Sequence, residues 1–78
     1  MHNLELLAEH LCRARIAKGV TPEQAAEQSG VYYYTLIALE AAKISAPTPS
    51  MLLRLAKYYD LDFSCLMQLA GHLRHGST

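Results

Sequence analysis

The segment of residues 21–40 constrains the fold most, because it has the pattern of two short helices with a glycine between them. The Thr21 side chain can cap the first helix, and Pro22 suits a first helical position, where no backbone donor is needed. Gly30 can end this helix because glycine adopts the left-handed backbone conformation at low cost. A second apolar pattern begins at Val31. The segment therefore predicts two helices joined by a tight turn.

The second helix of this pair has two faces of different character. Val31, Leu36 and Leu39 recur at helical spacing, so we expect them to point into a core. The opposite and flanking faces carry Tyr33, Tyr34, Ile37 and Ala38. An aromatic and aliphatic surface is therefore expected on the side that faces away from the core.

Periodicity also predicts helices on both sides of this pair. An apolar stripe at helical spacing indicates a first helix from residue 4 to about residue 18, ended by Gly19. A fourth helix is expected over residues 51–59, capped by Thr48 or Ser50, and a fifth over about residues 64–73. No strand pattern occurs in the sequence, so the expected fold class is all-α.

The composition is that of a folded domain, with 51% hydrophobic and 18% charged residues in a chain of 78. This length predicts a single domain over residues 1–78, with a core at about residues 4–73 and a frayed C-terminal tail. No apolar run approaches the ~20 residues that span a bilayer, and the N-terminal segment carries acids where a signal peptide would be basic. We therefore expect a cytoplasmic protein with no membrane segment.

The residues that commonly support catalysis or metal binding form no convincing set. Cys12 and Cys65 lie within apolar helical patterns, which indicates buried free thiols and not a disulfide framework. His72 and His75 have a spacing seen in zinc sites, but no second ligand pair accompanies them. No nucleophile with a partnered base and no phosphate-binding loop is present. We expect no enzymatic activity, no metal and no cofactor.

The pattern resembles the lambda-repressor/Cro-type helix-turn-helix proteins, the XRE family. The resemblance covers about residues 11–70 and implies a compact five-helix DNA-binding domain, with the helix-turn-helix at helices two and three. Ala26 stands where that motif needs a small residue between crossing helices, and Gly30 stands at the turn. The other residues that carry the resemblance are Arg15, Leu36, Leu39, Pro47 and the run of residues 52–62.

The resemblance also implies one internal ion pair. Arg15 stands where the family places an arginine that pairs with a glutamate at the end of the recognition helix, and Glu40 is that glutamate. Such a pair would be largely buried and would orient the first helix against the recognition helix more than it would add net stability. The alternative is two independent surface charges.

On this resemblance, the second motif helix would enter the major groove of double-stranded DNA, as in a small bacterial or phage repressor-type transcriptional regulator. This helix carries no arginine, lysine, asparagine or glutamine, so phenol hydroxyls and contacts to thymine methyl groups would have to read the bases, with an A·T preference. Pro22 replaces a glutamine with which the family commonly clamps a phosphate. The expected DNA-binding residues are Tyr32, Tyr33, Tyr34, Thr35, Ile37, Ala38 and Lys43.

The charge balance is unusual for a DNA-binding protein. Seven basic residues match seven acidic ones, whereas DNA-binding proteins usually carry an excess of positive charge. An exposed face of Tyr33, Tyr34 and Ile37 also has the composition of a protein-binding hot spot. The alternative function is therefore a protein-interaction module, such as an antitoxin, co-regulator or adaptor. A simpler explanation of the three tyrosines has Tyr32 packed across the turn and the other two on the surface.

A homodimer is expected from the size of the binding head. One small head contacts about four to six base pairs, so related proteins bind two half-sites about one turn of DNA apart. The residues expected at the dimer interface are Phe63, Met67, Ala70 and Leu73. The alternative is that these side chains only close the core. Arg13, Lys18, Arg54 and Lys57 are more typical of solvated helix faces, with a contact to DNA as the alternative for each.

Overall fold

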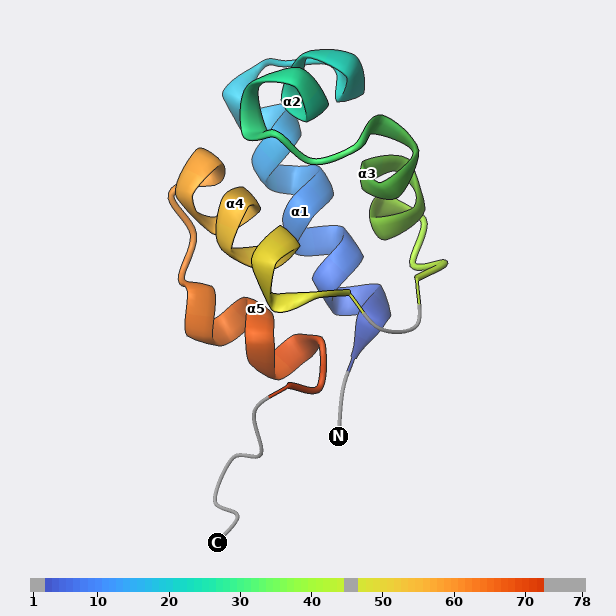
Figure 1. Cartoon of the computed structure of the whole chain (residues 1–78), viewed down its shortest axis with the longest axis vertical. Helices are drawn as coiled ribbons and strands as arrows, with labels where there is room; N and C mark the ends of the chain where they lie inside the picture. Colours follow the sequence, from blue (N-terminus) through green and yellow to red (C-terminus); the bar gives the residue numbers. More distant parts are fainter. Residues whose placement is uncertain (1–2, 45–46, 73–78) are drawn as a thin grey trace, which may run out of the picture.

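A computed structural model describes residues 3–44 and 47–72, and in these residues every regular element is an α-helix (Figure 1). The all-α, five-helix fold predicted from the sequence is confirmed. The long first helix runs through the molecule, the second crosses one end of it, and the fifth lies near its other end. The helices are α1 (Leu4–Lys18), α2 (Pro22–Ser29), α3 (Tyr33–Glu40), α4 (Pro49–Tyr59) and α5 (Phe63–Leu69).

The start of α2 is fixed by the residues that the sequence pattern indicated. The Thr21 hydroxyl accepts a hydrogen bond from the Gln24 amide at 3.1 Å, and the Thr21 amide donates to the Gln24 side-chain oxygen at 2.9 Å. This reciprocal pair satisfies two backbone donors that a helix start otherwise leaves free. At its other end α2 stops at Gly30, whose φ of 80° is left-handed. The predicted turn is confirmed.

The boundaries of the last two helices differ from the prediction. Thr48, and not Ser50, caps α4, so this helix begins at Pro49 instead of at residue 51. The α5 helix ends at Leu69, four residues before its predicted end at Leu73, which lies outside the described residues. Gly71 ends this helix because its φ of 86° turns the chain, and the His72 amide then donates to the Met67 carbonyl.

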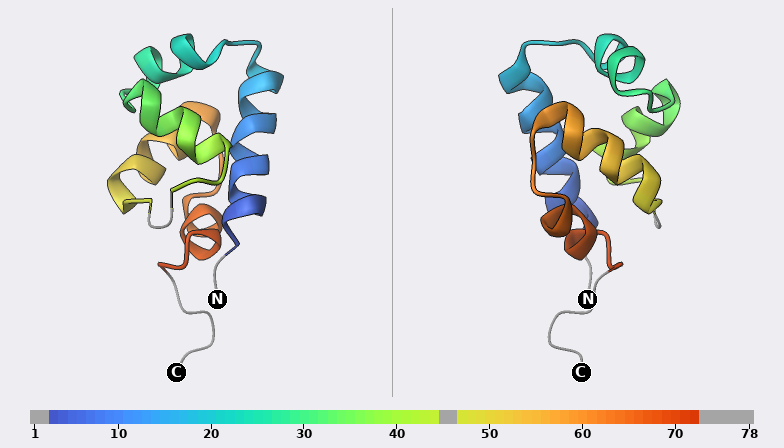
Figure 2. Two further views of the ribbon diagram at one scale, coloured as in Figure 1. Left: turned by 90° about the vertical axis from the view of Figure 1, so that its right-hand side faces the viewer. Right: turned by 60° about the vertical axis from the view of Figure 1, so that its left-hand side comes forward.

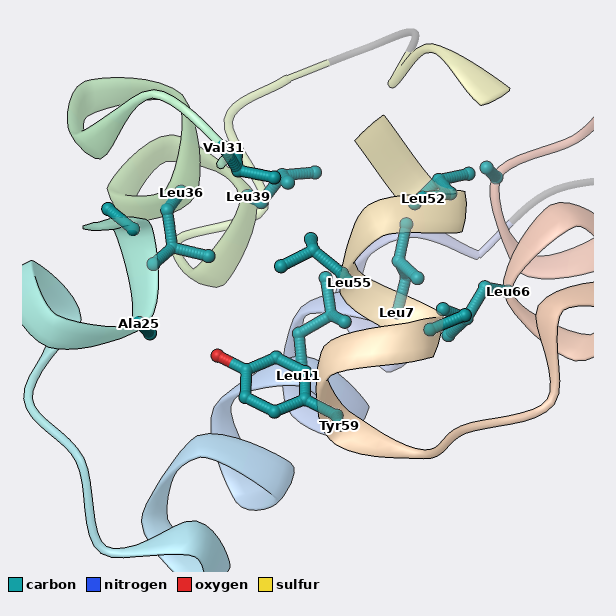
Figure 3. Close-up of a cluster of buried hydrophobic side chains, with 13 residues drawn as sticks. Leu7, Leu11, Ala25, Val31, Leu36, Leu39, Leu52, Leu55, Tyr59 and Leu66 are labelled. Atoms are coloured by element: carbon teal, nitrogen blue, oxygen red, sulfur yellow. The ribbon is translucent and has the colours of Figure 1, made fainter. Parts of the chain in front are cut away.

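The core lies between α1 and the helices that surround it (Figure 3). Val31, Leu36 and Leu39 are buried, as their spacing predicted. Each fully buried leucine stabilises the fold by about 1.5–3 kcal/mol relative to an exposed one. The largest fully buried side chains are Leu7, Leu11, Leu36, Pro47, Leu52, Leu55 and Leu66.

The start of α1 lies beside the end of α5, as both views of Figure 2 show. The Asn3 amide donates to the Leu69 carbonyl at 2.8 Å, and the Asn3 side chain caps α1. These two contacts fix the first helix to the last one. Because α1 also packs against α3 and α4, it forms the common support of the helices that carry the candidate site.

The structure also shows the surroundings of the two cysteines and of His72. Cys12 and Cys65 are free thiols, as predicted, but they are half-buried and not fully buried. The His72 ring Nε2 contacts the Pro47 carbonyl oxygen, and His75 lies outside the described residues. Within residues 3–44 and 47–72, every helix is too short or too polar to span a bilayer.

Candidate nucleic-acid interface

The start of α3 carries an aromatic patch formed by Tyr32, Tyr33 and Tyr34. The side chains of Tyr32 and Tyr34 are 72% and 70% exposed, and their ring centroids lie 6.0 Å apart. The Tyr33 and Tyr34 rings meet edge to face, with centroids 5.1 Å apart. The patch therefore presents two exposed phenol groups, one of which, Tyr34, also contacts the Tyr33 ring.

The ring that packs against the core is Tyr33, which corrects the simpler explanation in which Tyr32 would do so. Tyr32 stands at the N-cap of α3, outside the helix proper, and its ring points to solvent. Tyr33 precedes Leu36 by three residues, so both lie on one helical face. Tyr33 is consequently half-buried and offers less of its surface to a partner than its neighbours do.

The remainder of α3 continues the exposed surface for one further turn. Ile37 follows Tyr34 by three residues and is 37% exposed, and Lys43 is exposed just beyond the helix. Thr35 and Ala38 are half-buried. Of the seven residues expected to bind DNA, the structure thus places Tyr32, Tyr34, Ile37 and Lys43 most openly toward solvent.

The position of Lys43 depends on how the chain leaves α3. Ala42 has a φ of 58°, a left-handed conformation that L-residues other than glycine rarely adopt. The Ala42 amide donates to the Leu39 carbonyl at 3.1 Å, and the Lys43 amide donates to the Ala38 carbonyl at 2.8 Å. This pair of bonds is the Schellman helix ending, formed here with alanine where glycine is usual. Lys43 is therefore held directly beyond the C-terminus of α3.

Arg15 on α1 and Glu40 at the end of α3 form the ion pair that the resemblance implied. The Arg15 Nε lies 3.1 and 2.9 Å from the two Glu40 carboxylate oxygens, and the two side chains are only 16% and 10% exposed. A second guanidinium nitrogen donates to the Val20 carbonyl at 3.1 Å. The hydrogen bond to Glu40 raises the pKa of Arg15 above its ordinary value. The pair locks the rotation of α3 relative to α1.

Tyr59 on α4 lies in the core with its hydroxyl buried, and that hydroxyl has no hydrogen-bond partner among the described residues. Burial, reinforced by the nearby Glu40 carboxylate, raises the pKa of Tyr59 to about 12. The interior next to the ion pair therefore contains an unsatisfied polar group, which destabilises the fold.

A cleft lies between the start of α3 and the start of α4. Arg54 reaches across it, because a Cβ built on Gly30 would lie 2.9 Å from the Arg54 Nη1. Glycine at the turn thus leaves room for the guanidinium as well as permitting the left-handed backbone. The first turn of α3 has no side-chain cap, so its amides remain open to an external acceptor. The cleft is lined by Gly30, Val31, Tyr32, Thr35, Thr48, Ser50, Met51 and Arg54.

Arg54 was expected on a solvated helix face, with a contact to DNA as the alternative. No local pattern marks it, because its contact with the turn depends on how α4 crosses α2.

The outer face of α4 contains further positive charge. Lys57 is exposed, and the Lys18 ammonium lies 4.8 Å from the centre of the Tyr58 ring.

The expected dimer surface is only partly available in the described residues. Ala70 is buried in the core of the single chain, so its side chain offers little area to a second copy. Phe63 and Met67 are half-buried and pack against the same core. Leu73 lies outside the described residues.

Two helices joined at a left-handed glycine, with the second one exposed and held by an internal ion pair, define a helix-turn-helix protein. The chain belongs to the helix-turn-helix domain family, whose model matches residues 6–64. Comparison with curated proteins and with solved structures gave no significant match. Membership of this family suggests a DNA-binding regulator in general terms.

Proposed function

We propose that this chain is a transcriptional regulator of the lambda-repressor/Cro type that places residues 32–40 in the major groove of DNA. The observation that carries the proposal is the orientation of α3. Leu36 and Leu39 hold one side of this helix in the core, and Glu40 fixes its rotation. Tyr34 and Ile37 are left on the outer side. The Arg15–Glu40 pair also supports the lambda-repressor/Cro type.

The charges at the two ends of α3 suit the two rims of the groove. A helix of eight residues is about 12 Å long, close to the ~12 Å width of the major groove. Lys43 stands beyond one end, and Arg54 with the uncapped amides stands at the other. Each end can therefore meet a phosphate of a different strand while the middle of the helix faces bases.

The base contacts available to α3 are weak ones. The exposed phenol hydroxyl of Tyr34 can donate to or accept from base edges, and Ile37 can contact thymine methyl groups. Each contact would contribute about 1 kcal/mol, below the roughly 1–3 kcal/mol of a good bidentate pair. We expect low specificity per half-site, which a homodimer on paired half-sites would raise. In this proposal the chain acts in the cytoplasm by binding and not by catalysis.

The decisive experiment is selection from random DNA duplexes by the purified chain at two salt concentrations. Lys43→Ala and Arg54→Ala should each lower the slope of log affinity against log salt by about one, with little change in sequence preference. Arg13→Ala is the matched control, because Arg13 is exposed on α1 and is already paired with Glu9. Failure to retain any duplex at low salt would refute DNA binding.

A second candidate function is a protein-interaction module that uses Tyr32, Tyr34 and Ile37. It is favoured by the presence of two widely exposed tyrosines in ring contact on a helix without cationic or amide side chains. Binding through such a surface should change little with salt, whereas DNA binding should weaken steeply. A partner whose affinity is lost in Tyr34→Ala but unaffected by Arg54→Ala would support this candidate.

A further inference from the structure

An apolar groove runs along the outer side of α2 and ends at the aromatic patch. Its lining joins the buried Ala26 and Val31 and the turn glycine Gly30 to two tyrosines of the aromatic patch. The same lining includes two exposed glutamates, which lie four residues apart on α2. We call this surface the acid–aromatic groove; it is lined by Glu23, Ala26, Glu27, Gly30, Val31, Tyr32 and Tyr33.

Of the two carboxylates, only that of Glu23 has a role in the fold. Glu23 lies in the first turn of α2, where a negative charge is favourable, although Thr21 and Gln24 already cap the helix. Glu27 lies near the C-terminal end of α2, where a negative charge is unfavourable. Like charges four residues apart also destabilise a helix slightly. In the described residues the ion pairs involve other glutamates, and α2 itself carries no lysine or arginine.

The groove combines the three features that bind a lysine or arginine side chain. The methylene part of such a side chain packs on apolar surface, which the exposed Tyr32 ring and the half-buried Tyr33 ring offer. Its charged end is attracted by carboxylates and by the faces of tyrosine rings, and the Tyr32 ring is largely exposed. A phosphate would instead be repelled by Glu23 and Glu27. The charge of the groove therefore selects a cationic partner and disfavours nucleic acid.

We propose that the acid–aromatic groove binds an extended segment of a partner protein that carries two cationic side chains separated by one residue. The Cβ atoms of Glu23 and Glu27 are expected about 5–6 Å apart on one helix face. Side chains two residues apart on an extended segment emerge on the same side about 6.6 Å apart. Each cation can thus face one carboxylate while the backbone follows the groove. The proposal does not rest on DNA binding by α3.

The test is a titration of the isotope-labelled chain with the peptide acetyl-Gly-Arg-Leu-Arg-Gly-amide, followed by amide chemical shifts. Saturable shifts should concentrate at Ala26, Glu27, Gly30 and Tyr32. The double variant Glu23→Gln/Glu27→Gln should lower the affinity for the peptide by about tenfold, because it removes two exposed charge contacts. Glu5→Gln is the control, since Glu5 is an exposed glutamate in the first turn of α1. It should leave the affinity unchanged.

Three results would overturn the proposal. They are no saturable shift at low salt, equal affinity for the double variant, and equal affinity for the acidic peptide acetyl-Gly-Glu-Leu-Glu-Gly-amide. Thermal melts of each variant establish that it is folded before titration. DNA binding is measured separately with the same samples. Loss of the peptide site with DNA binding intact, or the reverse, therefore shows which of the two proposals has failed.

Discussion

Ala42 provides the sharpest test of how the chain leaves α3. Its left-handed φ of 58° costs an L-residue roughly 1–2 kcal/mol, and glycine avoids this cost. Glycine in turn makes the unfolded state more favourable by about 0.5–1 kcal/mol. The substitution Ala42→Gly should therefore stabilise the chain by about 0.5–1 kcal/mol. For a chain of this size the melting temperature should rise by about 2–8 °C.

The control for this prediction is the neighbouring alanine. Ala41 has a φ of −96° and a ψ of 3°, which alanine adopts without left-handed strain. Ala41→Gly should therefore destabilise by about 0.5–1 kcal/mol, because only the entropic cost remains. Thermal and urea unfolding followed by circular dichroism measure both variants. The reasoning fails if Ala42→Gly lowers stability, or if both substitutions change it in the same direction.

Three further predictions concern the core and the charges. Tyr59→Phe should stabilise by up to about 1 kcal/mol in urea unfolding, because it removes a buried hydroxyl without a partner. Folding raises the pKa of Tyr59 from 10.0 to about 12, so the hydroxyl ionises first in the unfolded state. The free energy of unfolding is therefore unaffected by its ionisation below pH 10.0 and falls as pH rises toward about 12. Urea unfolding at neutral pH and at about pH 11 should show a smaller alkaline loss in Tyr59→Phe than in the wild type. Arg15→Ala should destabilise by about 2–3 kcal/mol in urea unfolding, and Arg15→Met with Glu40→Leu should cost less than Arg15→Ala alone. Glu23→Gln/Glu27→Gln should strengthen binding to a random DNA duplex about two- to tenfold at low salt, measured by fluorescence anisotropy; weaker binding would contradict the charge argument.

The sequence predicted those parts of the fold that depend on local chemistry. The cap at Thr21, the turn at Gly30 and the inward face of Leu36 and Leu39 follow from helix periodicity and from capping. The start of α4 was misplaced because Thr48 and Ser50 are both able to cap a helix. Pro49 is a local signal in favour of Thr48, because proline suits the first helical position directly after the cap.

The site was less predictable because it joins residues from different helices. The inward position of Tyr33 could have been found, since it precedes Leu36 by three residues and shares its face. Tyr32, at the N-cap, obeys no helical period. Arg54 meets the turn only because α4 lies against the end of α2, and nothing in its neighbourhood in the sequence reports that contact. The Arg15–Glu40 pair came from the resemblance and not from periodicity.

The zero net charge of the chain conceals a separation of charges in the structure. Lys43 and Arg54 flank the two ends of α3, whereas Glu23 and Glu27 line the groove on α2. A sum over the sequence cancels these charges, but a ligand meets only those near its own site. Tyr32 borders both the cleft beside Arg54 and the acid–aromatic groove. If DNA and a cationic segment both use this ring, each must weaken the binding of the other by the same factor, because coupling between two sites is reciprocal.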